Sequence, residues 1–284
     1  MGELPMKIMV TGAGGQLGQE LVRLPREDVE WIGLDRSRLD VADEEQCRAA
    51  VAAIRPDAII HTAAYTAVDR AESEPEEAYR VNALGTRYVA EAAEAVGAKL
   101  VCVSTDYVFD GQGTEPYKEE DAANPRTVYG RTKLEGERLA LEACSRTFIA
   151  RTSWVYGAYG ANFVRTMLQL ASQHSVLRVV DDQRGSPTYT YDLACFLTEL
   201  AGTERYGVYH ASNGGECTWY EFAKAIFEIS GIDVRLIPCT TEEFPRPAPR
   251  PAYSVLGQRA LLRNGFKELR HWRAALEDFL KPRK

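Results

Sequence analysis

The sequence predicts an α/β protein with a doubly wound parallel sheet and a smaller second lobe. Three observations support this prediction. Short apolar runs alternate with segments of helical periodicity through the first half of the chain. A glycine-rich turn joins the first apolar run to the first helical segment. After residue 156 the alternation becomes less regular, which indicates a separate lobe.

Length and composition limit the classes of protein that need to be considered. The 284 residues suit one large α/β domain with a smaller lobe, and 45% hydrophobic with 26% charged residues is typical of a globular chain. A net charge of −7 argues against a nucleic-acid partner. No apolar run approaches the about 20 residues that span a bilayer, so no membrane partner is expected.

The termini and the cysteines favour a cytoplasmic protein. Residues 1–6 lack a basic segment followed by an apolar core, so no signal peptide is expected. The cysteines show no Cys-x-x-Cys spacing, and the four histidines are scattered. We therefore expect reduced thiols and no metal site. The cysteines are Cys47, Cys102, Cys144, Cys195, Cys217 and Cys239.

The first strand–turn–helix unit has the pattern of a dinucleotide-binding fingerprint. A strand is predicted at residues 7–11 and a helix at 16–24, with three spaced glycines between them and in the first turn of the helix. Gly12 permits a tight turn, Gly15 lets the backbone approach a pyrophosphate, and Gly18 allows close helix–strand packing. The alternative is an ordinary glycine turn. The next strand, which ends in an acidic residue, argues against that alternative.

The second strand, predicted at residues 30–34, leaves two cofactors open. It ends in Asp35, about 20 residues beyond the glycines, where a carboxylate can accept from a ribose 2′-hydroxyl. Arg36 and Arg38 follow at once and could instead hold a 2′-phosphate. The sequence therefore points to both NADH and NADPH.

The next segment carries a second acidic candidate and a run of small residues. Residues 39–41 are predicted to form a short third strand, and Asp40 could contact adenine or cap a helix at 44–54, two alternatives of equal weight. Residues 58–61 are predicted to form a buried strand. The small residues in 62–66 would let a flat ligand lie against the backbone.

Two polar residues in apolar surroundings receive different interpretations. His61 precedes the end of its strand, so packing is favoured over a role as catalytic base. Helical segments are predicted at 72–80 and 81–95. Asn82 lies inside the second of these, where its propensity is unfavourable, so it is expected to have a specific hydrogen-bonding role.

A strand at residues 99–103 leads into Thr105, and Tyr129 and Lys133 open a helix predicted at 129–142. A phenol and an ammonium four residues apart lie on one helical face. A neighbouring ammonium favours phenolate and makes the tyrosine a usable proton donor or acceptor near neutral pH. A hydroxyl at a strand end can orient a carbonyl. Together these groups could reduce a ketone with a nicotinamide; a solvated helix face is the alternative.

The remaining elements complete a Rossmann-like sheet and a substrate-binding lobe. Ligands of such sheets bind at the carboxyl ends of the strands, where the candidate residues converge. We predict an NAD(P)-binding domain at 1–153, rejoined by part of 186–230, and a lobe at 154–284. The further predicted elements are strands at 146–150, 177–180 and 234–238, helices at 162–173, from 192, at 218–230 and at 269–280, and a loop at 182–188.

These motifs resemble those of the extended short-chain dehydrogenases/reductases, and more narrowly of the dTDP-4-dehydrorhamnose reductase family, over nearly the whole chain. The specific strings are Ser104-Thr-Asp-Tyr-Val-Phe-Asp-Gly111 and Arg151-Thr-Ser-Trp-Val-Tyr-Gly157. Supporting strings are Gly12-Ala-Gly-Gly15-Gln-Leu-Gly18, the run 63–75, Val128-Tyr-Gly-Arg-Thr-Lys133, the run 181–188 and Arg250-Pro-Ala-Tyr-Ser254.

The resemblance implies NADPH- or NADH-dependent reduction of the C4 ketone of dTDP-4-dehydro-β-L-rhamnose to dTDP-β-L-rhamnose, the last step of dTDP-L-rhamnose synthesis. Thr105, Tyr129 and Lys133 would be catalytic. Tyr129 would protonate the developing oxyanion. Lys133 would lower the tyrosine pKa and hold the nicotinamide ribose. Thr105 would hydrogen-bond the carbonyl oxygen.

The resemblance and the strand-end positions also imply two sets of ligand contacts. The sugar nucleotide would meet Thr105, Asp106, Tyr107 and Trp154, and Arg250 would meet its diphosphate; core packing for Trp154 and an exposed loop for Arg246 and Arg250 are the alternatives. The cofactor contacts would be Gly12, Gly15, Gln16, Leu17, Gly18, Asp35, Arg36, Asp40, Val41, Ala63, Ala64, Tyr65, Thr66, Val103, Tyr129 and Lys133.

Two positions depart from the family pattern. Gly257 stands where the family usually has Asp, which puts the local turn in doubt. Some members dimerise through a magnesium site built from glutamates; Glu20 matches one ligand, but Tyr191 stands at a second, so Mg²⁺ is not predicted. Monomer and homodimer both stay open.

Two alternative functions remain beside the reductase. One is a related nucleotide-sugar reductase or epimerase that acts on a different sugar, which the glycine turn and the Tyr-x-x-x-Lys spacing cannot exclude. The other is a non-enzymatic subunit like the regulatory subunit of methionine adenosyltransferase. The presence of Thr105, Tyr129 and Lys133 argues against the second alternative.

Overall fold

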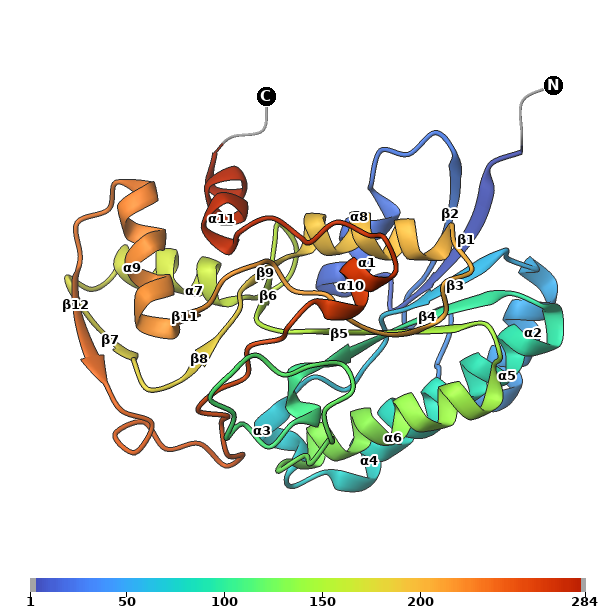
Figure 1. Cartoon of the computed structure of the whole chain (residues 1–284), viewed down its shortest axis with the longest axis horizontal. Helices are drawn as coiled ribbons and strands as arrows, with labels where there is room; N and C mark the ends of the chain where they lie inside the picture. The colour runs from blue at the N-terminus through green and yellow to red at the C-terminus, as the bar shows by residue number, and fades with distance from the viewer. Residues whose placement is uncertain (1–3, 282–284) are drawn as a thin grey trace.

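The main sheet has six parallel strands, five from residues 6–152 and one from residues 207–210 (Figure 1). The computed structural model describes residues 4–281, so part of the segment 1–6, for which no signal peptide is expected, lies outside the described residues. The strand order is β10-β5-β4-β3-β1-β2, and every neighbouring pair is parallel. The strands are β1 (Met6–Thr11), β2 (Val29–Leu34), β3 (Ala58–His61), β4 (Lys99–Thr105), β5 (Thr147–Thr152) and β10 (Gly207–His210).

Helices cover both faces of this sheet, which explains its apolar strands (Figure 1). Ile8 and Val10 of β1 pack with α1 (Gln16–Val22) and α8 (Thr190–Ala201) in one cluster. Met9, between them in sequence, packs on the other face. That face is covered by α2 (Glu44–Ile54), α5 (Thr86–Val96) and α6 (Val128–Ala143). From β1 the chain builds β2 on one side and then crosses to β3, so β1 and β3 flank the switch point at which such sheets bind ligands.

The predicted third strand at residues 39–41 is wrong, and these residues form a turn. Leu39 and Val41 are buried against the α2 and α5 face, so their apolar character reflects packing of a turn. Asp40 accepts from the backbone N–H of Ala42 at 3.0 Å and does not cap α2. That cap is Asp43, which accepts from the backbone N–H of Gln46.

The segment predicted as helices at 72–80 and 81–95 is divided differently. It contains α4 (Pro75–Tyr79), a π-helical turn at Arg80–Gly85 and then α5, and a separate short helix, α3 (Val68–Ala71), precedes it. Pro75 is the first residue of α4, because proline fits the start of a helix and disrupts its interior. The π-helical turn contains Asn82, and such turns often occur at functional sites.

The second lobe has its own aromatic core and stands beside the carboxyl ends of the strands (Figure 1). Its largest buried side chains include Tyr156, Tyr189 and Phe222. Four elements that the sequence did not predict, β6, β8, β9 and β11, pair as β6–β9 and β8–β11. The lobe contains β6 (Val155–Tyr156), α7 (Phe163–Ala171), β7 (Val176–Val180), β8 (Arg184–Gly185), β9 (Thr188–Tyr189), β11 (Cys217–Thr218), α9 (Trp219–Ser230), β12 (Arg235–Cys239) and α11 (Trp272–Leu280). Helix α10 (Arg259–Arg263) packs on the main sheet beside β10.

The chain returns from the lobe to the main sheet within residues 186–230. Strand β10 pairs with β5, and α8 packs in the same cluster as β1. Across residues 4–281 no helix combines the length and apolarity needed to cross a bilayer.

Candidate active site

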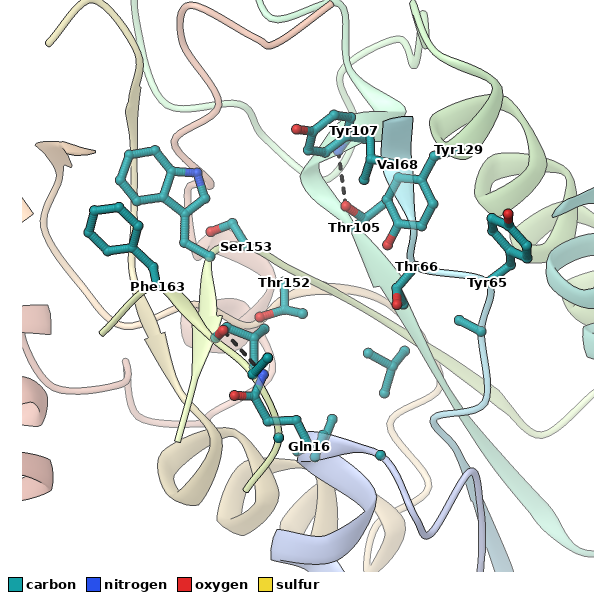
Figure 2. Close-up of a pocket in the computed structure, with 18 of the residues that line it drawn as sticks. Gln16, Tyr65, Thr66, Val68, Thr105, Tyr107, Tyr129, Thr152, Ser153 and Phe163 are labelled. Atoms are coloured by element: carbon teal, nitrogen blue, oxygen red, sulfur yellow. Dashed lines mark hydrogen bonds between the residues drawn. The ribbon is translucent and has the colours of Figure 1, made fainter. Parts of the chain in front are cut away.

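A cavity of about 1290 Å³ lies between the carboxyl ends of the strands and the second lobe (Figure 2). Pockets for one small ligand usually measure about 300–1,000 Å³, so this cavity has room for two. With one exception, every cofactor, catalytic and substrate residue predicted from the sequence lines it. The exception is Asp35.

The glycine turn forms one end of the cavity. Gly12 has a φ of +67°, and a side chain at Gly18 would come within 2.2 Å of the Gly12 carbonyl oxygen, so turn and helix pack as the spacing predicts. Gln16, at the start of α1, donates to the Val155 carbonyl at 3.2 Å and accepts from Asn162 at 2.9 Å (Figure 2). The glycine turn is therefore tied to the second lobe.

Asp35 and Arg36 occupy different positions relative to the cavity. The Asp35 carboxylate folds back on its own turn and accepts from the Ser37 N–H and hydroxyl, at 2.9 and 2.6 Å. These hydrogen bonds lower the pKa of Asp35, and the one from the Ser37 hydroxyl has the largest effect. Arg36 is exposed and lines the cavity. The sequence left open whether Asp35 or a following arginine contacts the cofactor's ribose. In the structure Arg36 lines the cavity and Asp35 does not.

Thr105 and Tyr129 meet where β4 ends and α6 begins. The Thr105 hydroxyl oxygen accepts from the Tyr107 N–H at 3.2 Å and donates to Asp106 Oδ1 at 3.0 Å. Gly130 follows Tyr129, and a side chain there would lie 2.1 Å from the Tyr107 carbonyl oxygen. The glycine therefore lets the start of α6 approach the end of β4. Figure 2 shows the Thr105 and Tyr129 hydroxyls directed toward the same space.

In this structure burial dominates the pKa of Tyr129, and the lowering expected from Lys133 stays a prediction. Burial raises the pKa of Tyr129 to about 12, and a hydrogen bond with Thr105 offsets part of that rise. The Lys133 ammonium donates to the Val103 carbonyl at 2.7 Å, and burial lowers the pKa of Lys133. Desolvation therefore dominates at the phenol. Tyr129 keeps its proton at neutral pH, which suits a proton donor.

Asn82 has the specific hydrogen-bonding role expected from its place in a helix. Its side-chain oxygen accepts from the Tyr65 N–H at 2.8 Å, and its nitrogen donates to the Tyr65 carbonyl and to the Thr132 hydroxyl, both at 3.1 Å. It thus joins the loop after β3 to helix α6. Tyr65 and the neighbouring Thr66 line the cavity (Figure 2).

His61 is a packed strand residue, as expected. Its ring nitrogens are within hydrogen-bonding distance of the Thr11 and Thr86 hydroxyls, at 2.7 and 3.1 Å. Burial lowers the pKa of His61 to about 3, so the ring is neutral across the physiological range. The side chain supports the sheet and does not line the cavity.

Asp106 presents a buried carboxyl group to the cavity. Only 3% of the residue is exposed, and burial raises its pKa to about 6. Its Oδ2 atom makes no hydrogen bond of regular geometry within the described part of the chain, and an interaction with the Ser254 hydroxyl offsets part of the rise in the Asp106 pKa. Buried polar atoms without a regular hydrogen bond are rare, so this oxygen is a strong candidate for a ligand contact.

Replacing Asp106 with Asn is expected to stabilise the protein at neutral pH. Because the folded pKa of about 6 lies above the unfolded value of 3.8, folding disfavours the charged form. The wild-type unfolding free energy is therefore highest below both values and falls as the pH rises between them. Asn removes this penalty, worth about 3 kcal/mol at neutral pH. Denaturant unfolding of both proteins at acidic and neutral pH measures the gain; an equal gain at both would contradict this cause.

Trp154 packs against a second indole and also lines the cavity, so both interpretations of its role stay open. Its indole stacks on that of Trp219, with ring centroids 3.5 Å apart and an interplanar angle of 8°, and both residues line the cavity. Phe163 also lines it, and its ring centroid lies 4.5 Å from that of Trp219. These three side chains form an aromatic wall on the side of the second lobe.

Arg250 lies on the cavity wall and is held by an ion pair. Its guanidinium donates to Asp69 Oδ2 at 2.8 Å and to the Ala248 carbonyl at 3.0 Å. Arg246, for which the resemblance implies no role, also lines the cavity, as does Arg178. The lobe therefore places three guanidinium groups along one ligand space.

The two departures from the family pattern lie outside this cavity. Glu20 is buried and accepts from the Thr190 hydroxyl at 2.8 Å. Gly257 donates its N–H to the Tyr117 carbonyl at 2.7 Å, and its own carbonyl oxygen is 2.9 Å from His210 Nδ1. These two contacts therefore hold the backbone at Gly257, where the departure from the family pattern put the local turn in doubt.

Comparison with known proteins agrees with this geometry. The family model described as RmlD substrate binding domain matches residues 6–284. The chain is 48% identical over 278 residues to the spore coat polysaccharide biosynthesis protein SpsK of Bacillus subtilis (strain 168), covering 98% of each protein. It is also 48% identical over 278 residues to a dTDP-4-dehydrorhamnose reductase of Streptomyces griseus, covering 95% of this chain and 91% of the relative.

A solved structure extends the similarity to three dimensions. The crystal structure of a dTDP-4-dehydrorhamnose reductase from Bacillus anthracis str. Ames in complex with NADP superposes with a TM-score of 0.96. The two chains are 45% identical, and the match covers 97% of this chain and 99% of the other. The fold and the resemblance expected from the sequence are thus confirmed, and the chain belongs to the RmlD substrate binding domain family.

Proposed function

We propose that the chain catalyses the NAD(P)H-dependent reduction of the C4 ketone of dTDP-4-dehydro-β-L-rhamnose to dTDP-β-L-rhamnose. One observation carries this proposal. Thr105, Tyr129 and Lys133 lie on the wall of a single cavity that begins at the glycine turn and ends at the aromatic wall of the lobe. A proton donor therefore stands between the space for a dinucleotide and the space for a sugar nucleotide.

The residues at the glycine end fit a nicotinamide dinucleotide. The tight turn at Gly12 and the small side chains of Ala63 and Ala64 leave the backbone open along the cavity. Val103 and Lys133 continue this wall toward Tyr129. The bound cofactor would supply the hydride that C4 of the sugar receives.

The chain's own residues would handle the proton and the position of the ketone. Tyr129 holds its proton at neutral pH and would give it to the ketone oxygen as C4 is reduced. The Thr105 hydroxyl would orient that oxygen by a hydrogen bond. Lys133 would hold the ribose next to the nicotinamide. Asp106 Oδ2, which makes no hydrogen bond of regular geometry among the described residues, would accept from a sugar hydroxyl.

The guanidinium groups of the lobe suit the diphosphate. Arg250 keeps donors beyond the two that bind Asp69 and Ala248, because a guanidinium carries five. Arg178 and Arg246 add positive charge along the same cavity. Bidentate donation to phosphate is the usual function of arginine in such sites.

The test is an assay of the purified full chain with dTDP-4-dehydro-β-L-rhamnose and either NADPH or NADH. The expected result is loss of the near-ultraviolet absorbance of the reduced nicotinamide, with dTDP-β-L-rhamnose as the product. Cofactor binding without oxidation would overturn this proposal. It would favour another 4-keto sugar nucleotide or the non-enzymatic subunit, and a panel of 4-keto sugar nucleotides would distinguish the two.

Replacing Arg36 with Ala is expected to raise the KM for NADPH about tenfold and to leave that for NADH within about twofold, because a charge-assisted hydrogen bond to a 2′-phosphate is lost. Arg38→Ala is the matched control, since Arg38 donates to the Gly33 carbonyl at 3.1 Å. Initial rates with both cofactors measure the ratio. Equal changes for NADPH and NADH would show that Arg36 does not read the 2′-phosphate.

Three further expectations stay predictions, beside the roles of the site residues. They are the division into a cofactor domain at 1–153 and a lobe at 154–284, the cytoplasmic location, and the choice between monomer and homodimer. The return of β10 and α8 to the main sheet supports the idea that part of 186–230 rejoins the first domain.

A further inference from the structure

Trp154 is held in a backbone conformation that a bulky residue rarely adopts. Its φ is +48°, in the left-handed region that favours glycine. Such strain costs about 1–3 kcal/mol and persists only where the surroundings enforce it. Here the Thr188 N–H donates to the Trp154 carbonyl at 3.1 Å, and the Ser153 hydroxyl donates to the Ser186 carbonyl at 2.7 Å. The strained residue and the residue before it are thus both fixed to the segment 186–188.

Two residues from the second lobe contact the indole itself. Trp219 stacks on it with centroids 3.5 Å apart. A side chain at Gly185 would come within 2.6 to 2.8 Å of three indole atoms, Cε2, Cζ2 and Nε1. No side chain larger than hydrogen fits at Gly185 while the indole keeps this position.

A short antiparallel ladder brings these two contacts together. Gly185 of β8 pairs with Cys217 of β11, and Thr218 then caps helix α9, whose first residue is Trp219. The Thr218 hydroxyl accepts from the Glu221 N–H at 3.1 Å, and the Glu221 carboxylate accepts from the Thr218 N–H at 2.8 Å. This capping box fixes the first turn of α9, and with it the ring that faces Trp154.

We propose that Trp219 and Gly185 are positioning residues that hold the Trp154 indole as the apolar wall of the sugar site. They thereby set the affinity for the sugar nucleotide. Sequence reasoning assigned neither residue a role, and only Trp154 and Trp219 of the three line the cavity. The inference rests on the proposed function in one respect, that the lobe side of the cavity receives the sugar.

The competing interpretation is that Trp219 only fills the core of the lobe. It packs against Phe163 and Phe222, so its loss would lower stability in either case. The two interpretations differ in the Michaelis constants. A residue that only fills the core would affect folding without singling out one ligand, whereas a positioning residue affects the ligand that meets the wall.

The experiment measures kcat, the KM for dTDP-4-dehydro-β-L-rhamnose and the KM for NADPH in Trp219→Leu and Gly185→Ala. In both variants the sugar KM is expected to rise about five- to tenfold, with the NADPH KM and kcat within about twofold. Alanine suits the backbone at Gly185, whose φ lies outside the left-handed region, so the indole is its main conflict. Trp219→Phe keeps an aromatic ring and is expected to restore most of the affinity.

A double-mutant cycle separates positioning from general damage. In a Trp154→Ala background, Gly185→Ala is expected to have no further effect on the sugar KM, because no indole remains to be displaced. Trp272→Phe is the matched control: Trp272 is buried in the same lobe and lies outside the cavity. It is expected to lower stability without changing either KM.

Two results would overturn the inference. One is a loss of thermal stability in Trp219→Leu and Gly185→Ala with an unchanged sugar KM. The other is full additivity of Gly185→Ala and Trp154→Ala. Calorimetric binding of dTDP-β-L-rhamnose gives the same comparison without turnover. If the wild-type chain binds this product but reduces no ketone, the proposed function is refuted, and the variants still test the positioning of Trp154 through their affinity for the product. If the wild-type chain does not bind the product, both the proposed function and the inference about the wall are refuted.

Discussion

Replacing Tyr129 with Phe is expected to lower kcat about a hundred- to ten-thousandfold, the usual contribution of a positioned proton donor. The substitution removes one hydroxyl and keeps the ring, which packs edge to face against Tyr107 with centroids 5.6 Å apart. Because burial holds the Tyr129 pKa near 12, the wild-type phenol carries the proton that Phe cannot supply. Stopped-flow and steady-state rates of nicotinamide oxidation measure the loss.

The matched control for this variant is Tyr65→Phe. Tyr65 also lines the cavity, but its hydroxyl donates to Glu74 at 2.7 Å and has no proposed part in proton transfer. Tyr65→Phe is expected to keep kcat within about threefold, since it loses one partly buried hydrogen bond away from the proposed proton transfer. NADPH should bind Tyr129→Phe with near wild-type affinity. Turnover of that variant above a tenth of the wild-type rate would show that another group delivers the proton.

The sequence predicted the sheet well because its strands are buried on both faces. All four residues of β3 are buried, so the apolar run stands out from its polar flanks. The same signal failed at residues 39–41, where Leu39 and Val41 are buried in a turn. It also missed β10, since two of its four residues are only partly buried and no helix follows immediately.

The candidate site was predictable where its residues belong to local motifs. Thr105, Tyr129 and Lys133 lie on predicted elements, and their spacing carries the chemistry. Trp219 was not predictable in this way, because only the pairing of β8 with β11 brings it to Trp154. The direction of the Lys133 ammonium, toward the Val103 carbonyl, and the burial that raises the Tyr129 pKa also depend on tertiary packing, so spacing alone could not give either.

The second large effect concerns the ion pair that supports the catalytic helix from behind. Arg151 of β5 donates to the Glu137 carboxylate through Nη2 at 2.7 Å and Nε at 3.0 Å, and both side chains are at least nine-tenths buried. Glu137 also accepts from the Ser104 hydroxyl at 2.5 Å. Ser104 precedes Thr105, and Glu137 lies one helical turn after Lys133. The pair therefore joins β4, β5 and α6 directly beneath the proposed catalytic groups.

Replacing Glu137 with Leu is expected to lower the free energy of unfolding by about 3–5 kcal/mol, because it leaves the Arg151 guanidinium charged and unpaired in a buried site. The thermal midpoint should fall by roughly 10 °C. Glu137→Leu combined with Arg151→Met is expected to recover most of this loss, since removing both charges also removes the desolvation penalty. Denaturant unfolding of the wild type, both single variants and the double variant measures the coupling. If the decreases in unfolding free energy of the two single variants simply add in the double variant, then burial of apolar volume, and not the charge pair, holds β4, β5 and α6 together.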